Sequence, residues 1–267
     1  MTNRKTRVVS FLAPTMLPVY ESMIGYVSRN LQWDMEVVAG SSYDELYQAD
    51  FSFVCGLPYV LRTAPRLDPS PIVAIVAPVL QGERYQNKPI YFSDVIVRQD
   101  SSFHSFDDLR GCSWAYNERQ SQSGYGVTRY WLVKLGQTHG YFSRVVEAGF
   151  HQNAIRMVCE GEVDASAIDS LVLAIERRDH PELEAKLRVI DSLGPSTIQP
   201  LVAATRIAPS LIEDVQSVFI GMHNDSRAMD FLRRGFIDHF VAVQDNDYDD
   251  IRQMMSVCEA ADFIELR

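Results

Sequence analysis

Short apolar runs alternate along the chain with segments whose apolar residues recur at every third or fourth position. The first pattern is typical of buried strands, and the second is typical of helices that pack on one face. Helical spacing is clearest from Met16 to Leu31, and Gly56 separates a buried run from the helix that Pro58 can begin. In this half of the chain we expect strands over 7–13, 35–39, 51–55, 71–79 and 90–98, and helices over 16–31, 43–48 and from 58 onward.

The middle of the chain repeats the alternation, and the C-terminal part has a mostly helical pattern. From Ser210 onward, apolar faces around Ile212, Phe219 and Met254 predict helices. In the middle we expect strands over 112–116, 144–148, 163–168 and 187–191, and helices over 106–110, 123–135, 152–160 and 170–178.

This order of elements predicts an α/β fold, because alternating strands and helices form parallel sheets covered on both faces. The chain holds two such series, and cores tend to divide above ~250 residues. We therefore expect two lobes, each a central sheet flanked by helices, joined by two extended hinge segments near 93–98 and 193–199. Lobe 1 would comprise 1–95 and 198–267, with lobe 2 inserted as 96–197. Ligands bind at the carboxyl ends of such strands, so a cleft is expected between the lobes.

Composition indicates a globular protein with an acidic surface. Apolar residues make up 46% of the chain and charged residues 22%, which excludes disordered and fibrous classes. No apolar run approaches the ~20 residues that a membrane-spanning helix needs. A formal net charge of −10 disfavours nucleic acid and anionic membranes as partners. An anion can still bind such a protein through oriented backbone N–H groups.

Cysteine spacing predicts neither a disulfide framework nor a metal site, and no cofactor is expected. Cys55, Cys112, Cys159 and Cys258 are far apart and have no histidine neighbours at ligand spacing. The N-terminus starts with basic residues, but its apolar stretch is too short for a secretory leader. We therefore expect a cytoplasmic protein, or a periplasmic or extracellular one from which a leader was removed.

A serine-rich segment lies where one expected strand gives way to a helix. Ser121, Gln122 and Ser123 stand there directly before Gly124. Serine is a favoured N-cap, and the first N–H groups of a helix lack internal acceptors. Hydroxyl and amide donors would converge on an anion, which also gains ~0.3–1 kcal/mol from the helix dipole. An ordinary helix cap is the alternative interpretation.

Two further polar segments follow expected strands. His151 opens one helix, where it can donate to an oxyanion or simply cap the helix. Asp169 and Ser170 stand at the next strand end, so we expect them to face the cleft. A carboxylate there accepts a proton from a protonated phosphorus oxyanion or from a ligand ammonium group, and repels a full dianion. A plain N-cap is again the alternative.

Five short segments occur in one order along most of the chain. The run 105–111 (SFDDLRG) precedes the Ser-x-Ser-Gly turn, and 151–155 (HQNAI) leads to 161–169 (GEVDASAID). Upstream lies 49–59, and downstream Gly235-Phe236 is followed by Asp247-Tyr248 within 235–248. No one of these motifs is highly specific, but together they resemble the phosphate-, phosphite- and phosphonate-binding proteins of ABC importers.

The resemblance implies a type 2 periplasmic-binding-protein fold that closes on its ligand like a hinged clamp. It implies that the Ser-x-Ser-Gly turn holds the anion and that tyrosines of the first lobe complete the set of residues around the anion. Tyr91 is one candidate tyrosine, and Ser93 is the alternative to it. With Ser170 added from its place at the strand end, the expected ligand-binding residues are Ser121, Gln122, Ser123, His151, Asp169, Ser170, Tyr59 and Tyr91.

Two features depart from the family pattern. We expect no leader and no lipid-anchor cysteine of the kind that an exported importer subunit carries, and Gln122 stands where the family often has a small hydroxyl residue. The first departure bears on transport and the second on the identity of the ligand.

The leading hypothesis is a solute-binding protein that captures phosphate, phosphite or a phosphonate for ABC-type uptake or for sensing. Its partner would then be a transporter permease or a sensor protein. The alternative is a leaderless cytoplasmic enzyme of cofactor biosynthesis on the same fold, with His151 and Asp169 as an acid–base pair. The sequence contains no nucleophile elbow, metal-ligand cluster or nucleotide-binding loop in support of that alternative.

Overall fold

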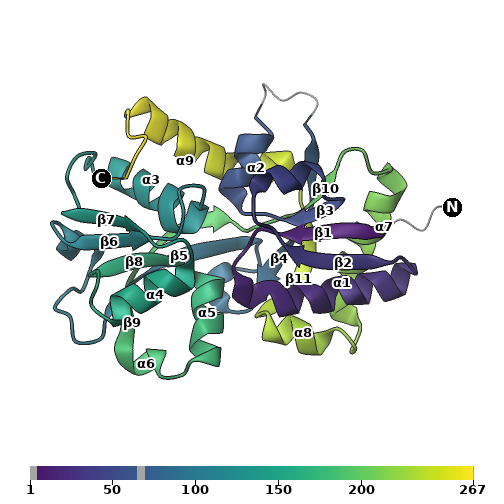
Figure 1. Ribbon diagram of the computed structural model, residues 1–267, viewed down its shortest axis with the longest axis horizontal. Helices are drawn as coiled ribbons and strands as arrows, with labels where there is room; N and C mark the ends of the chain where they lie inside the picture. Colours follow the sequence, from purple (N-terminus) through teal and green to yellow (C-terminus); the bar gives the residue numbers. More distant parts are fainter. Residues whose placement is uncertain (1–4, 65–69, 267) are drawn as a thin grey trace. The chain divides into compact units, whose positions relative to one another are not determined.

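The chain folds into two compact units, each with its own sheet (Figure 1). The computed structural model describes residues 5–64 and 70–266. Unit 1 comprises Met1–Ile90 with Thr197–Asp249, and unit 2 comprises Tyr91–Ser196 with Asp250–Arg267. The chain therefore passes between the units three times, once more than the two hinge segments expected from the sequence.

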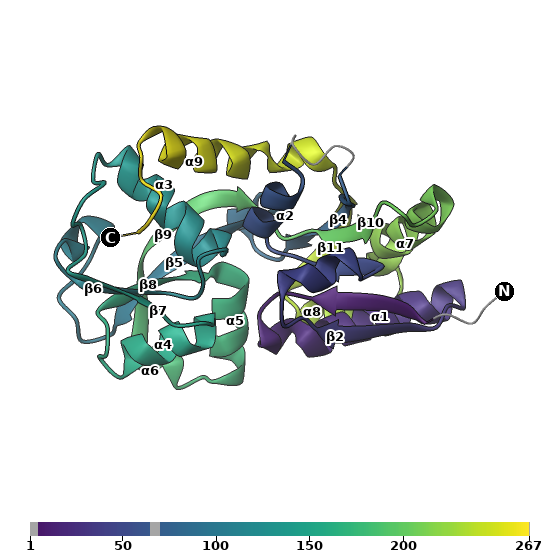
Figure 2. The same cartoon turned by 45° about the horizontal axis from the view of Figure 1, so that its top comes forward.

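Unit 1 is built on a six-stranded mixed sheet with the order β11-β4-β10-β3-β1-β2. Strands β2, β1 and β3 are parallel, whereas β10 runs antiparallel to both β3 and β4 and β11 runs antiparallel to β4. Helices α1 and α8 contact each other beside this sheet (Figures 1 and 2). The strands are β1 (Thr6–Ser10), β2 (Met35–Ala39), β3 (Phe51–Phe53), β4 (Ile72–Leu80), β10 (Leu201–Ala204) and β11 (Ile237–Ala242), and the helices are α1 (Leu17–Leu31), α2 (Gly56–Arg62), α7 (Pro209–Gly221) and α8 (Met229–Arg234).

Unit 2 is built on a five-stranded sheet with the order β7-β6-β8-β5-β9. Strand β6 is parallel to β7 and β8, and β5 is antiparallel to β8. Helix α3 lies on one side of this sheet, and α4 and α5 lie on the other (Figures 1 and 2). The strands are β5 (Ile90–Arg98), β6 (Ser113–Tyr116), β7 (Arg144–Glu147), β8 (Ala165–Asp169) and β9 (Leu187–Thr197), and the helices are α3 (Val127–Lys134), α4 (His151–Cys159), α5 (Ser170–Asp179), α6 (Leu183–Lys186) and α9 (Asp249–Ala260).

Alternation along the strands of unit 2 explains how its core forms. Trp114 and Ala165 are paired neighbours on β6 and β8, and both are fully buried on the face that carries the aromatic core. Phe106 stacks on Tyr141, and Phe142 stacks on Trp114 in the same cluster. Because side chains alternate across a strand, the next residues along β6 and β8 face the other layer. This packing fixes the strand ends from which the polar segments project.

Two parts of the expected fold differ from the structure. The C-terminal residues from Asp250 onward pack with unit 2, whereas the sequence placed 198–267 in lobe 1. The cause is Phe263, which is fully buried in the core of unit 2. Strand β11 lies within the part expected to be mostly helical. A bulge between Ile237 and His239 shifts its pairing to β4 and so interrupts the period of two that would have indicated a strand.

None of the helices within the described ranges combines the length and apolar character that a bilayer crossing requires.

Candidate functional site

The serine segment forms a wide turn between β6 and α3. Residues Gln122–Gly126 make one π-helical turn, called here the serine turn, which continues directly into α3. Ser121 caps this turn, because its Oγ accepts a hydrogen bond of 3.1 Å from the Gly124 amide. The Gly126 amide donates to the Ser121 carbonyl at 2.9 Å. Turns of this type often occur at functional sites, and the first amides of a helix lack acceptors within the helix.

Glycine at position 124 allows a close contact with Asn117, just after the end of β6. A Cβ atom at Gly124 would lie 2.1 Å from Asn117 Oδ1 and 3.2 Å from the Asn117 backbone nitrogen. The Asn117 carbonyl in turn accepts from the Gly149 amide at 2.7 Å, in the loop that leads to α4. The serine turn and the start of α4 are therefore held against the same strand end. Asn117 was not among the residues singled out from the sequence.

A chain of hydrogen bonds joins three of the expected site residues within unit 2. Ser121 Oγ lies 3.2 Å from Ser123 Oγ, which lies 2.9 Å from His151 Nε2. Ser121, Ser123 and His151 are all buried. His151 is the first residue of α4, so its ring stands at a second helix start. The structure thus brings together side chains from two of the three segments.

Burial keeps the imidazole of His151 neutral at physiological pH. It lowers the pKa of His151 from 6.5 to about 4, because the charged ring would lose its hydration. Within the described residues, His151 Nδ1 is buried and has no hydrogen-bond partner. A neutral imidazole has one donor nitrogen and one acceptor nitrogen, so Nδ1 can serve a ligand in either role.

The side chain of Gln122 contacts two other residues of unit 2. Its Nε2 lies 3.2 Å from Ser196 Oγ and 3.2 Å from Met254 Sδ. Ser196 is the last residue of the first segment of unit 2, and Met254 belongs to α9 in its second segment. The amide side chain of Gln122 is thus directed to structural partners of unit 2.

Asp169 and Ser170 lie at the end of β8, as the strand pattern predicts. Asp169 Oδ1 accepts from the amides of Leu171 at 2.8 Å and Val172 at 3.3 Å, so it is the N-cap of α5. Ser170 Oγ accepts from the Phe92 amide at 3.3 Å. Both residues are buried.

The two candidate tyrosines lie in different units. Tyr59, in α2 of unit 1, donates to Asp245 Oδ1 at 2.9 Å and packs edge-on against Tyr248. Tyr91 is the first residue of unit 2 and is buried within β5. Its neighbour Ser93 pairs with Asp169 in the sheet. Tyr91 and Ser93 thus lie near the strand end that carries Asp169, whereas Tyr59 is placed by the other unit.

Comparison with protein families decides the identity of the chain. Residues 8–248 match the family described as the periplasmic substrate-binding protein of phosphonate ABC transporters. The chain belongs to this family. The function of this family is to bind the substrate of a phosphonate ABC transporter. That function is therefore the function of this chain, and the enzyme alternative with His151 and Asp169 as an acid–base pair is not supported.

Several solved structures share the fold of this chain. The binding protein of an ABC phosphonate transporter from Pseudomonas aeruginosa has a TM-score of 0.82 at 16% identity, covering 97% of this chain and 87% of that one. PhnD1 of Prochlorococcus marinus, in complex with methylphosphonate, has a TM-score of 0.81 at 15% identity, covering 98% and 99%. A Xanthomonas citri protein bound to ATP has a TM-score of 0.67 at 18% identity, covering 98% and 99%. At these identities the comparison shows the fold, which is the expected type 2 periplasmic-binding-protein fold.

Proposed function

We propose that the chain binds a phosphorus oxyanion at the serine turn of unit 2, through neutral donors. The observation that carries this proposal is the hydrogen-bonded chain Ser121–Ser123–His151 at the start of two helices. The turn supplies hydroxyl groups and helix-start amides, and His151 supplies a buried ring nitrogen without a partner in the described residues.

Neutral donors suit the charge of this protein. The chain carries a formal net charge of −10, and the imidazole of His151 is uncharged at pH 7 because its pKa is about 4. An anion at the helix start gains ~0.3–1 kcal/mol from the helix dipole, and more when the site is partly buried. Donors that are already held by packing also lose little conformational freedom on binding. Tight binding therefore needs no cluster of Lys or Arg.

The hydrogen bonds between Ser121, Ser123 and His151 can run in either direction, which suits more than one protonation state of the ligand. When His151 Nε2 accepts from the Ser123 hydroxyl, Nδ1 carries the proton and donates to a ligand oxygen. When Nε2 donates instead, Nδ1 accepts from a P–OH group. In the first arrangement the Ser121 hydroxyl donates to Ser123 Oγ. In the second, the Ser123 hydroxyl donates to Ser121 Oγ, which also accepts from the Gly124 amide, so the Ser121 proton is left for the ligand. The same residues then serve a phosphonate dianion or its protonated monoanion.

Asp169, Ser170 and Tyr91 form the second part of the proposed site. We assign to the Asp169 carboxylate the acceptance of a P–OH or ammonium proton of the ligand, in addition to its capping of α5. The cleft between lobes and the contribution of Tyr59 stay predictions. Gln122 is proposed to contribute through its backbone amide, because its side chain is directed to Ser196 and Met254.

Family membership also supports a proposal for location and partner. The family is periplasmic and serves ABC transporters. We therefore infer that this protein acts in the periplasm and that its protein partner is a transporter permease. Phosphonates are the favoured ligand class, with phosphite and phosphate as competitors of similar size and charge.

Calorimetric titration with methylphosphonate, phosphite and phosphate tests the proposed site. Ser123→Ala should weaken binding about tenfold through loss of one hydrogen bond to a charged group, and Ser123→Leu should abolish binding. Ser166→Ala is the matched control, since Ser166 is a buried serine of the same unit whose Oγ has no partner among the described residues. Unchanged affinity of the folded Ser123→Leu protein for every ligand would exclude this site.

A further inference from the structure

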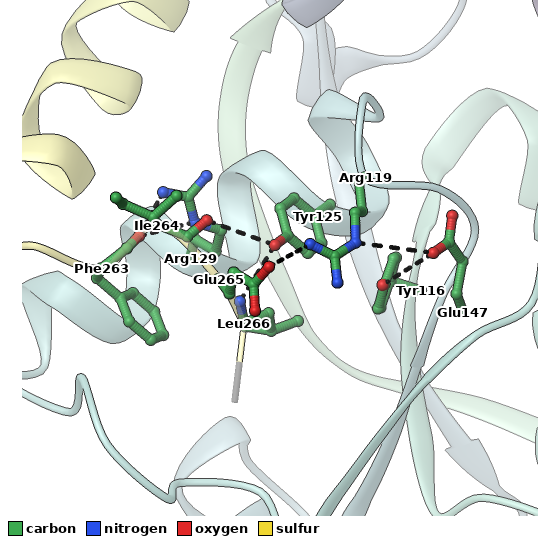
Figure 3. Close-up of polar contacts among 9 residues, drawn as sticks. All are labelled: Tyr116, Arg119, Tyr125, Arg129, Glu147, Phe263, Ile264, Glu265 and Leu266. Atoms are coloured by element: carbon green, nitrogen blue, oxygen red, sulfur yellow. Dashed lines mark hydrogen bonds and ion pairs between the residues drawn. The ribbon is translucent and has the colours of Figure 1, made fainter.

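The C-terminal residues Phe263–Leu266, called here the C-terminal strap, lie beside the serine turn and α3 (Figure 3). Phe263 and Leu266 are buried in the same core cluster as Tyr125 of the serine turn. Ile264 is 64% exposed and thus faces away from that core. The strap is therefore anchored at both ends by apolar side chains, with its backbone between them close to polar groups of the turn.

Two side chains bind the backbone of the strap. Arg129 in α3 donates through Nε to the Phe263 carbonyl at 2.9 Å, and its Nη2 bonds the same oxygen. Tyr125 Oη accepts from the Leu266 amide at 3.2 Å and lies 3.5 Å from the Ile264 carbonyl, to which it donates (Figure 3). Hydrogen bonds to a charged group such as the Arg129 guanidinium are worth more than neutral ones.

An outer ion pair joins the strap to the loop that precedes the serine turn. Arg119 Nη1 lies 2.6 Å from Glu265 Oε1, and Arg119 Nε lies 3.9 Å from Glu147. The Arg119 and Glu265 side chains are 56% and 59% exposed, so solvent screens this pair and it contributes little. The less exposed contacts of Tyr125 and Arg129 are therefore the stronger ones. Together these contacts join the strap to Arg119 before the serine turn, to Tyr125 within it and to Arg129 after it.

We propose that the C-terminal strap is a positioning element for the anion site, with Tyr125 and Arg129 as its positioning residues. Tyr125 is itself part of the serine turn, and its ring is held between Tyr116 and the strap, 4.8 Å from the Tyr116 ring. Ser123 and the Gly124 amide directly precede Tyr125. A shift of the Tyr125 ring would therefore change the direction in which the Ser123 hydroxyl and the Gly124 N–H point. Small misplacement of donors costs much affinity when a site relies on pre-aimed groups. This inference rests on the proposed function of the serine turn.

A pair of tyrosine variants separates positioning from simple stability. Tyr125→Phe removes the hydroxyl that bonds the strap. Tyr141→Phe is the matched control, because Tyr141 is buried in the same core and its hydroxyl donates to the Phe106 carbonyl at 2.7 Å, away from the turn. Calorimetry with methylphosphonate should show affinity about tenfold lower for Tyr125→Phe and unchanged for Tyr141→Phe, as expected for a loss of pre-aimed donors. Thermal unfolding of both proteins measures the stability loss that they share.

Arg129 provides an independent arm of the same test. Arg129→Met removes both hydrogen bonds to the strap, whereas Arg129→Lys keeps one donor and a charge. The expected order of methylphosphonate affinity is wild type, then Arg129→Lys, then Arg129→Met, with the Gly124 amide resonance displaced in the same order in the ligand-free proteins. Should Tyr125→Phe fail to fold, this order decides the question.

Two results would overturn the inference. One is wild-type affinity in Tyr125→Phe and Arg129→Met, and the other is a loss of affinity in Tyr141→Phe equal to that in Tyr125→Phe. Failure of the proposed function looks different, because wild-type protein would then not bind methylphosphonate, phosphite or phosphate, or Ser123→Leu would bind them normally.

Discussion

At the residue scale, burial sets the chemistry of the few side chains that form the proposed site. His151 is the clearest case. A histidine at a helix start on the surface would be half-charged near pH 6.5, but burial lowers the pKa of His151 to about 4. The ring therefore acts as a neutral hydrogen-bonding group between Ser123 and the proposed ligand position.

The low pKa of His151 makes the free energy of unfolding depend on pH. Between pH 6.5 and about 4 the unfolded chain binds a proton at His151 that the folded protein does not. Stability from this residue is therefore present above pH 6.5 and is lost as the pH falls, by about 2 kcal/mol between pH 7 and pH 5. Denaturant unfolding at both pH values should show a smaller difference for His151→Gln than for wild type. The exposed His139→Gln variant serves as the control, and an equal pH difference in all three proteins would contradict the assignment.

Gly124 makes a second residue-scale prediction. Gly124→Ala places a Cβ 2.1 Å from Asn117 Oδ1, so one of the two must move. We expect a loss of about 1–3 kcal/mol in stability, as for other overpacked sites, together with weaker methylphosphonate binding. Adding Asn117→Ala removes the clashing amide and should restore part of both losses. The backbone nitrogen of residue 117 remains 3.2 Å away, so full recovery is not expected. A strictly additive double mutant would show that this contact does not govern the turn.

At the element scale, helix starts carry both the fold and the site. The serine turn, α4 and α5 each begin at the end of a strand of one sheet, and each begins with a polar side chain that caps it or lies beside the cap. The apolar patterns of these elements are strong, so their existence could be predicted from the sequence. The hydrogen bond between Ser123 and His151 could not be predicted in this way. It joins two loops, and it depends on the relative positions of the ends of the two strands that precede them.

Asp169 allows capping to be separated from binding. Asp169→Asn keeps an oxygen that can accept from the amides of Leu171 and Val172, whereas Asp169→Ala loses the cap, at a cost of ~1 kcal/mol. If the carboxylate also serves the ligand, Asp169→Asn binds a protonated phosphonate or an aminophosphonate more weakly while its unfolding midpoint stays near wild type. Equal affinity of the Asp169→Asn and wild-type proteins for both ligands would restrict Asp169 to capping. Calorimetry and thermal unfolding of the same samples measure both quantities.

At the scale of the whole molecule, the order of elements was more predictable than their assembly. The alternation of strands and helices and the five family-like segments pointed to the fold that the structural neighbours share. The C-terminal segment was assigned to the wrong unit, because the local pattern around Phe263 shows that it is buried but not in which core. Strand β11 was missed because a bulge interrupts its alternation.

A crystal structure of the protein with methylphosphonate tests the central claim most directly. We expect phosphonate oxygens within about 3.2 Å of the Ser123 hydroxyl, His151 and the amides at the start of the serine turn. A phosphonate held instead by Lys or Arg side chains, with the serine turn outside hydrogen-bond distance, would contradict it.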